Sequence, residues 1–146
     1  MSEYKIAYPS SIIEFKSYYY FRWLYLRKPL NKKLGSEKDS LESKSIHRMI
    51  TYQNKIIAVG RIHEILKLKY QIRYFAVDEK FRRKNIGSLL MKTLEADIRN
   101  KGGRFIILNA RENAIDFYKS LNYSIIKKTN LLFGKIQHYE MMKIII

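Results

Sequence analysis

The sequence contains no cysteine, and only two prolines and six glycines occur among its 146 residues. Without cysteine the chain can form no disulfide, and it offers neither a thiol nucleophile nor a thiolate metal site. Its three histidines, His47, His63 and His138, are too far apart in sequence for their spacing to predict a metal site. The composition therefore excludes thiol chemistry, predicts no metal, and gives no reason to place the protein in an oxidising compartment.

Acidic residues are also scarce, because 13 Asp and Glu face 29 Lys and Arg, and the formal net charge is +16. A charge of this size raises the hypothesis that the protein binds nucleic acid. The basic residues are spread along the chain rather than gathered into one arm, and the same positive field would draw a phosphate-bearing substrate into a cleft. Nucleic acid therefore stays a candidate partner, but the sequence does not favour it.

Long hydrophobic runs are missing as well. No stretch approaches the roughly 20 apolar residues that span a membrane, and the first residues lack the apolar core of a signal peptide. We therefore expect a cytoplasmic protein without a membrane partner. The length predicts one domain, residues 1–146, with an adequate core.

Apolar periodicity and turn residues predict an α/β fold in the broad sense, with a mixed α+β central sheet and helices on both faces. The predicted order is β-α-β-β-β-α-β-α-β-β. Strands are expected at residues 4–8, 45–52, 56–64, 70–77, 104–109, 123–128 and 137–146, and helices at residues 11–28, 86–98 and 113–121.

Residues 75–91 combine the end of a strand, a basic turn and the start of a helix. Unpaired N–H groups and the positive end of the helix dipole attract anions at such a place. Arg82, Arg83 and Lys84 add full charges that a diphosphate can engage. The segment therefore predicts a pyrophosphate-binding loop, and the alternative is an ordinary solvated helix cap.

Two segments resemble motifs of the GNAT superfamily of acyl-CoA-dependent N-acetyltransferases. Residues 82–87, Arg-Arg-Lys-Asn-Ile-Gly, are similar to the loop Q/R-x-x-G-x-G/A, with Asn85 at the first glycine position. Residues 108–123 are similar to the stretch N-x-x-A-x-x-F-Y-x-x-x-G-F, with Asn122 at the glycine position. Asparagine is the residue after glycine that best adopts positive φ, so we expect both backbone turns to be kept.

The resemblance implies acetyl-CoA as the acyl donor, bound in a cleft where the fourth and fifth strands splay apart. It implies that Tyr118 is the general acid that protonates the departing thiolate, whereas the alternative is that the pair Phe117 and Tyr118 belongs to the core. It also implies that Asn113 binds the pantetheine arm and that the amide of Val77 donates to the thioester carbonyl. The implied donor-binding residues are Phe75, Ala76, Val77, Arg82, Arg83, Lys84, Asn85, Ile86, Gly87, Ser88, Asn109, Asn113 and Phe117.

Direct attack by an amine benefits from a general base, because an ammonium must first lose a proton. The candidates are Glu37, His63, Glu64 and His138. Adjacent strand residues face opposite ways, so His63 and Glu64 cannot both point into the cleft. Each candidate has a plain alternative, as a surface charge for Glu37 and as ordinary hydrogen-bonded residues for the histidines.

Acceptor choice is expected to depend on residues 18–43 and 131–139. Arg22 and Trp23 are expected at the entrance to the cleft. The carboxylates of the loop at residues 35–42 could hold a cationic amine, and the alternative is a solvated charged loop.

The leading hypothesis is an N-acetyltransferase that acts on a primary amine of a small molecule or peptide. The alternative is a non-catalytic basic module that binds CoA or nucleic acid on the same fold. Pairing of an apolar edge strand at residues 141–146 would support a homodimer, but the same run fits a buried strand equally well.

Overall fold

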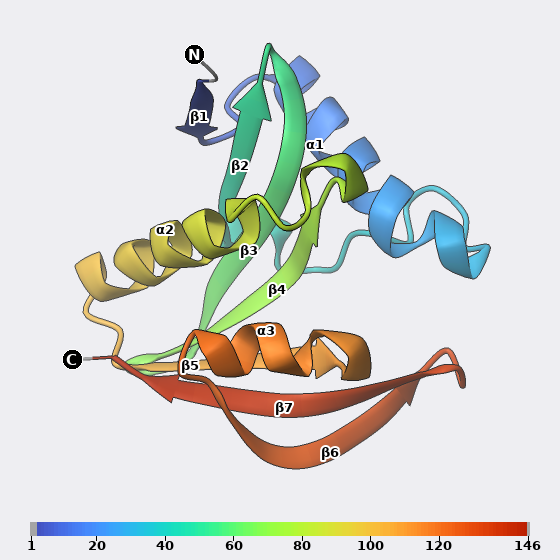
Figure 1. Cartoon of the computed structure of the whole chain (residues 1–146). Coiled ribbons are helices and arrows are strands. Elements are labelled where there is room, and N and C mark those ends of the chain that lie inside the picture. Colours follow the sequence, from blue (N-terminus) through green and yellow to red (C-terminus); the bar gives the residue numbers. More distant parts are fainter. Residues whose placement is uncertain (1–2, 146) are drawn as a thin grey trace.

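The computed structural model describes residues 3–145 and forms a mixed sheet with helices on both faces (Figure 1). Its strands are β1 (Tyr4–Ala7), β2 (Ile46–Tyr52), β3 (Lys55–Leu66), β4 (Lys69–Val77), β5 (Phe105–Arg111), β6 (Ser124–Leu132) and β7 (Ile136–Ile144). Its α-helices are α1 (Ile12–Leu26), α2 (Ile86–Asn100) and α3 (Ile115–Ser120). Short 3-10 turns are η1 (Lys28–Leu30), η2 (Glu42–Lys44), η3 (Glu79–Phe81) and η4 (Glu112–Ala114). The predicted order of strands and helices is confirmed.

The seven strands lie in the order β1-β2-β3-β4-β5-β7-β6. Every neighbouring pair is antiparallel except β4 and β5, which run parallel. Strand β7 is paired on both sides, with β5 and with β6, and its Met141 is fully buried. The run at residues 141–146 is therefore paired on both sides only as far as Met142, and Ile144 at the end of β7 is 62% exposed, so a homodimer stays a prediction.

Strands β4 and β5 pair over only three residues each. Lys69–Gln71 face Phe105–Ile107, and beyond this point the two strands separate, so that β5 and β7 turn away from β4 (Figure 1). A bulge in β4 adds to the separation, because Tyr74 and Phe75 lie where the pairing with β3 skips a residue, and Tyr74 has a φ of 56°. The sheet therefore opens between its two central strands.

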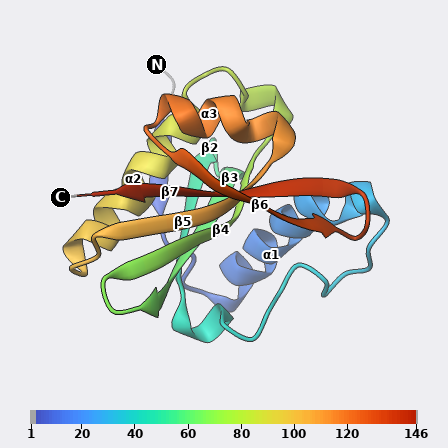
Figure 2. The same ribbon diagram turned by 90° about the horizontal axis from the view of Figure 1, so that it is seen from below.

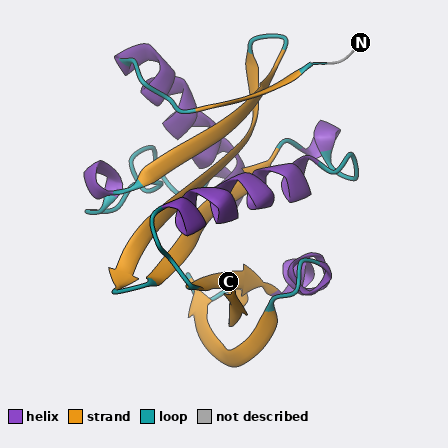
Figure 3. Ribbon diagram, turned by 90° about the vertical axis from the view of Figure 1, so that its left-hand side faces the viewer, coloured by secondary structure: helices purple, strands orange, loops and turns teal. Residues whose placement is uncertain are grey.

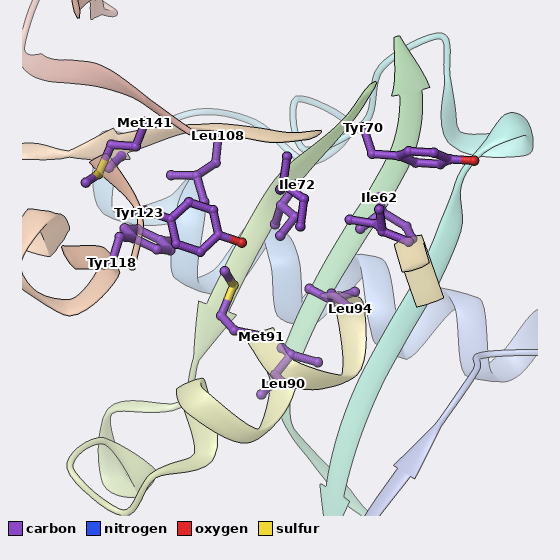
Figure 4. Close-up of a cluster of buried hydrophobic side chains, with 14 of the residues drawn as sticks. Ile62, Tyr70, Ile72, Leu90, Met91, Leu94, Leu108, Tyr118, Tyr123 and Met141 are labelled. Carbon is purple, nitrogen blue, oxygen red and sulfur yellow. The ribbon is translucent and has the colours of Figure 1, made fainter. Parts of the chain in front are cut away.

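The helices cover the two faces of the sheet separately. Helix α2 packs with the large cluster that contains Ala58, whereas α1 packs with the cluster that contains the next residue, Val59. Figures 2 and 3 show α1 on the face opposite to α2. Alternation along β3 therefore supplies both cores from one strand. Side chains of the larger core include Leu90, Met91 and Leu94 of α2 (Figure 4).

Local signals at the helix ends behave as the sequence predicts. Ser11 accepts a hydrogen bond from the amide of Glu14 at 3.0 Å, and the Glu14 carboxylate accepts one from the amide of Ser11 at 3.2 Å. This capping box starts α1. Asn85 before α2 has a φ of 63°, and Asn122 after α3 has a φ of 72°. Within residues 3–145, no helix is both long and apolar enough to cross a bilayer.

Candidate active site

A cavity of about 930 Å³ lies where β4 and β5 separate. Its walls come from β4, the start of α2, the end of β5, α3, the last turn of α1 and β7. The cavity brings together most residues that the sequence pointed to. These are Phe75, Ala76, Val77, Arg82, Arg83, Asn85, Gly87, Ser88, Asn109, Asn113, Phe117, Tyr118 and His138.

One end of the cavity is formed by the turn before α2. Asn85 caps this helix in the left-handed conformation, and its side chain makes no capping hydrogen bond. The first helical amides, those of Ile86, Gly87 and Ser88, have no carbonyl one turn before them and are donors for an anion. The Ile86 side chain is buried in the core, so only its amide is available here. Lys84 does not line the cavity, and its ammonium lies 5.4 Å from the centre of the Phe81 ring.

Gly87 lets an aromatic ring lie directly against this turn. A Cβ at this position would come within 3.1 Å of the Phe117 ring, which is tighter than ordinary van der Waals contact. Phe117 in turn lies 6.1 Å from Phe75, measured between ring centres. The packing of Phe117 across the cavity wall thus favours glycine at the second glycine position of the loop, because any larger residue would require the ring to shift.

The exposed edge of β4 carries main-chain donors. The amide of Asp78 donates to the carbonyl of Ile57 on β3 at 2.8 Å. Because neighbouring amides of an extended strand point to opposite edges, the amide of Val77 points away from β3 and toward the cavity. β4 has no paired strand on that side beyond Gln71, so an extended ligand can pair with its main chain.

Tyr118 lies deeper in the cavity wall. It is only 8% exposed, and burial raises the pKa of its phenol well above the usual value. Its ring lies beside that of Tyr123 (Figure 4), with the ring centres 6.0 Å apart. The Tyr123 hydroxyl donates to Glu95 at 2.8 Å. The Tyr118 hydroxyl is thus protonated at neutral pH, which is the form that a general acid needs.

Of the base candidates, only His138 lines the cavity. Glu37 is buried elsewhere, and its carboxylate accepts a hydrogen bond from the amide of Gly35 at 2.8 Å. His63 is buried with its Nδ1 3.2 Å from a guanidinium nitrogen of Arg61. Glu64 is exposed, so it and His63 face opposite ways, as expected.

The environment of His138 makes it an acceptor of protons. Its Nδ1 lies 3.0 Å from the carbonyl oxygen of Ile136. Because a carbonyl only accepts, Nδ1 carries the hydrogen and Nε2 is free in the neutral ring. Burial, and then the nearby charges of Arg111 and Arg27, hold the pKa of His138 below its usual value near 6.5. The ring is therefore mostly neutral at pH 7.

Three arginines lie on the acceptor side of the cavity, and sequence reasoning missed two of them, Arg73 and Arg111, whereas Arg27 falls within the expected range 18–43. Burial lowers the pKa of both Arg27 and Arg111. Arg27 donates to the carbonyls of Ser36 and Leu26, at 3.1 Å each, and no hydrogen bond from the Arg111 side chain is found within residues 3–145. No Asp or Glu is among the residues that line the cavity. The alternation of Asn109 and Arg111 along β5 is the signal that could have placed Arg111 here.

Two expectations about the acceptor side were wrong. Arg22 does not stand at the entrance, because it is fully buried and donates to Glu42 at 2.9 Å. The loop carboxylates are not available to a cationic amine either, because Asp39 and Glu42 are engaged by arginines of the chain itself. The polar loop is neither a substrate site nor simply solvated.

Comparisons with known proteins agree with this geometry. The model of the acetyltransferase (GNAT) family matches residues 11–123. This chain belongs to that family. The uncharacterized N-acetyltransferase YjcF of Bacillus subtilis (strain 168) is 30% identical over 131 residues, which cover 89% of this chain and 92% of the relative. The protein is therefore an acyltransferase of the GNAT type.

Solved structures share the fold at much lower identity. A putative N-acetyltransferase from Lactobacillus plantarum superposes with a TM-score of 0.86 at 14% identity, covering 98% of this chain and 99% of that one. An aminoglycoside 6'-N-acetyltransferase complexed with coenzyme A superposes with a TM-score of 0.82 at 15% identity, covering 97% of each chain. These likenesses confirm the predicted mixed sheet and its flanking helices.

Proposed function

We propose that this GNAT protein transfers the acetyl group of acetyl-CoA to a primary amine by direct attack, with residues 1–146 acting as one domain. One observation carries the proposal. A single cavity is lined by the unpaired edge of β4, the start of α2, Tyr118 and His138. These are a place for an extended thioester, an anion site, a proton donor and a proton acceptor.

The donor would lie along β4 with its diphosphate at α2. The amides of Gly87 and Ser88 and the guanidiniums of Arg82 and Arg83 offer the hydrogen bonds and the charge that a diphosphate requires. The pantetheine arm would pair with the β4 main chain like an added strand, with Asn113 at its side. A protein with the same fold is complexed with coenzyme A, which supports a CoA thioester as the donor.

The chemistry then needs three proton transfers. The Nε2 atom of His138 would take a proton from the amine, whose nitrogen forms a bond to the thioester carbon while the bond from that carbon to sulfur breaks. The amide of Val77 would stabilise the negative charge that grows on the carbonyl oxygen. Tyr118 would give its proton to the departing thiolate, and the proton held by His138 would return to Tyr118 through water.

The acceptor is proposed to carry an oxyanion such as a carboxylate beside its amine. Arg27 is buried and Arg111 is partly buried; both line the acceptor side and have no carboxylate partner within residues 3–145. A cationic acceptor would meet several positive charges and no negative one, whereas an anionic group could bind a guanidinium with two hydrogen bonds.

Two measurements test the proposal. Acetyl-CoA at a hundred times its dissociation constant should stabilise the protein by about 2.7 kcal/mol, which thermal unfolding detects. Thiol release from acetyl-CoA should then be faster with amines that carry a carboxylate than with their methyl esters. Absence of a thermal shift would refute the binding of acetyl-CoA. Equal rates for the carboxylate amines and their methyl esters would refute an anionic group on the acceptor. Binding without release for any amine would favour the non-catalytic module.

A further inference from the structure

The loop between α1 and β2 is fastened to the sheet by a buried network of charges. Arg22 and Arg61 are fully buried, and both donate to the same Glu42 oxygen at 2.9 Å. Arg61 also donates to both carboxylate oxygens of Asp39, at 2.6 Å and 3.0 Å. Asp39 in turn accepts a hydrogen bond at 2.8 Å from Arg73, which lines the cavity. The network therefore runs from the interior of the fold to the acceptor side.

The charges of this network do not cancel. Three guanidiniums, those of Arg22, Arg61 and Arg73, face two carboxylates, those of Asp39 and Glu42. Burial lowers the pKa values of the nearby His47 and His63, so these histidines add no charge at pH 7. One positive charge is left over, and Arg73 is the only one of the three arginines with an exposed side chain, 43% against 0% for the other two. The excess charge is thus presented to the cavity.

Asp39 fixes the orientation of that charge. Its Oδ2 binds Nη1 of Arg73, and the guanidinium carbon lies 4.5 Å from the centre of the Tyr74 ring. Asp39 itself cannot rotate freely, because Oδ1 also accepts a hydrogen bond from the amide of Leu41 at 2.9 Å. Arg73 is therefore held by a carboxylate on one nitrogen and by an aromatic ring on one face, while its other N–H groups stay available to a ligand.

We propose that Asp39 is a positioning residue, which holds the Arg73 guanidinium at the cavity wall for the anionic group of the acceptor. This inference rests on the proposed function. It assigns a role in substrate selection to a loop that contributes no side chain of its own to the cavity lining.

A purely structural role explains the contact less well. Asp39 is already anchored by two hydrogen bonds from buried Arg61, so the loop stays fastened without Arg73. An exposed ion pair contributes little to stability, typically under about 1 kcal/mol. What the contact with Asp39 adds is a fixed direction for a long and otherwise mobile side chain, and loss of that direction affects binding rather than folding.

The test compares Asp39→Asn with a matched control, Asp97→Asn. Asp97 is held by a similar two-pronged ion pair, with Arg48 at 2.7 Å and 2.8 Å, but it joins β2 to α2 away from the cavity. Both variants should lose stability. Only Asp39→Asn should raise the acceptor KM, by up to the roughly tenfold increase expected for Arg73→Ala, while the KM for acetyl-CoA stays within about twofold.

A double variant separates positioning from general damage. When Arg73 is already alanine, the further change Asp39→Asn should alter the acceptor KM by less than about twofold. If the two changes multiply instead, Asp39 acts independently of Arg73 and the inference is overturned. An Asp97→Asn variant with the same rise in acceptor KM would overturn it as well.

Side-chain nitrogen NMR supplies a readout that needs no turnover. The Arg73 guanidinium signal, assigned with Arg73→Ala, should show restricted motion in the unmodified protein and in Asp97→Asn, and should become mobile in Asp39→Asn. An Arg73 guanidinium that stays restricted in motion in Asp39→Asn would refute the proposal that Asp39 positions it. If the NMR result holds but no amine is acetylated by the unmodified protein, the proposed function fails, and with it the assignment to acceptor binding, while Arg73 is still shown to be held by Asp39.

Discussion

The proposed base can be tested through the pH dependence of a single substitution, His138→Asn. A general base contributes roughly 10²-fold to 10⁴-fold to a rate, so we expect kcat to fall by at least about a hundredfold at pH 8. The pKa of His138 lies below its usual value near 6.5 because of burial and of the charges of Arg111 and Arg27. At pH 7.5 the ring would then be at least about 90% neutral, so the full contribution is present there.

The sign of the pH effect follows from the form that reacts. His138 accepts a proton only when it is neutral, so its contribution should shrink tenfold per unit as the pH falls below its pKa. The acceptor amine also ionises, but its ionisation changes the rates of the unmodified protein and of His138→Asn equally. Dividing the first rate by the second therefore removes the effect of the amine. We expect this rate ratio to be constant above pH 7 and to fall at lower pH.

The assay is thiol release at saturating acetyl-CoA between pH 5.5 and 8.5. The matched control is His63→Gln, because burial also lowers the pKa of His63 but this side chain does not line the cavity. His63→Gln should show the same fall in rate at low pH as the unmodified protein. A rate ratio of unmodified protein to His138→Asn that does not change with pH would refute the base role of His138. Disappearance of the fall at low pH in His63→Gln would assign the base role to His63.

Other predictions follow from the same geometry. Tyr118→Phe should lower kcat more than tenfold with little change in the KM for acetyl-CoA, and a full rate in single-turnover assays would assign the acid role to water. Changing Arg82 and Arg83 together to alanine should abolish most of the thermal shift by CoA, and calorimetry at two salt concentrations would show whether charge is the cause. Tyr123→Phe removes the hydroxyl that donates to Glu95 and leaves Lys143 as the partner of that carboxylate, so urea denaturation should show a loss of about 1 kcal/mol with an unchanged KM for acetyl-CoA. Titration with nucleic acid should show no affinity that falls by orders of magnitude over modest increases in salt, and a steep slope would restore the polyanion hypothesis.

The donor side of the cleft could be predicted from sequence because it is built from short, contiguous segments. The turn at residues 82–87 needs only a strand, a basic turn and a helix start, and its backbone conformation follows from Asn85, the residue after glycine best suited to positive φ. The end of α3 follows from Asn122 in the same way. In the proposed function main-chain donors bind the diphosphate here, so local sequence would determine most of the site.

The acceptor side could not be predicted, because it joins side chains from four elements that are distant in sequence. Arg22 shows how residue type misleads. Arginine is usually exposed, yet Arg22 shares with Tyr18 and Phe21 the helical spacing of the buried face of α1. Helical spacing predicts the burial of Arg22 better than residue type does. The burial of Arg22 also depends on its ion pair with Glu42, from a loop whose position no local rule gives. The sign of the charge inside the cavity depends on which arginines are paired with carboxylates of that loop.

The two sides of the cleft depend on different features of the chain. Neighbours with 14% and 15% identity share the fold. In this chain the strand separation that creates the cleft depends on the sheet pairing rather than on particular side chains. On the acceptor side, the charge of the cavity wall depends on how many arginines are paired with carboxylates. Asp39 and Glu42 neutralise two of three arginines, and exchange of either carboxylate for a neutral residue would increase the positive charge near the cavity. We therefore expect acceptor preference to respond more to substitutions in residues 31–45 than to equally distant substitutions in α2, which a saturation scan of both segments with one acid and one ester acceptor would measure.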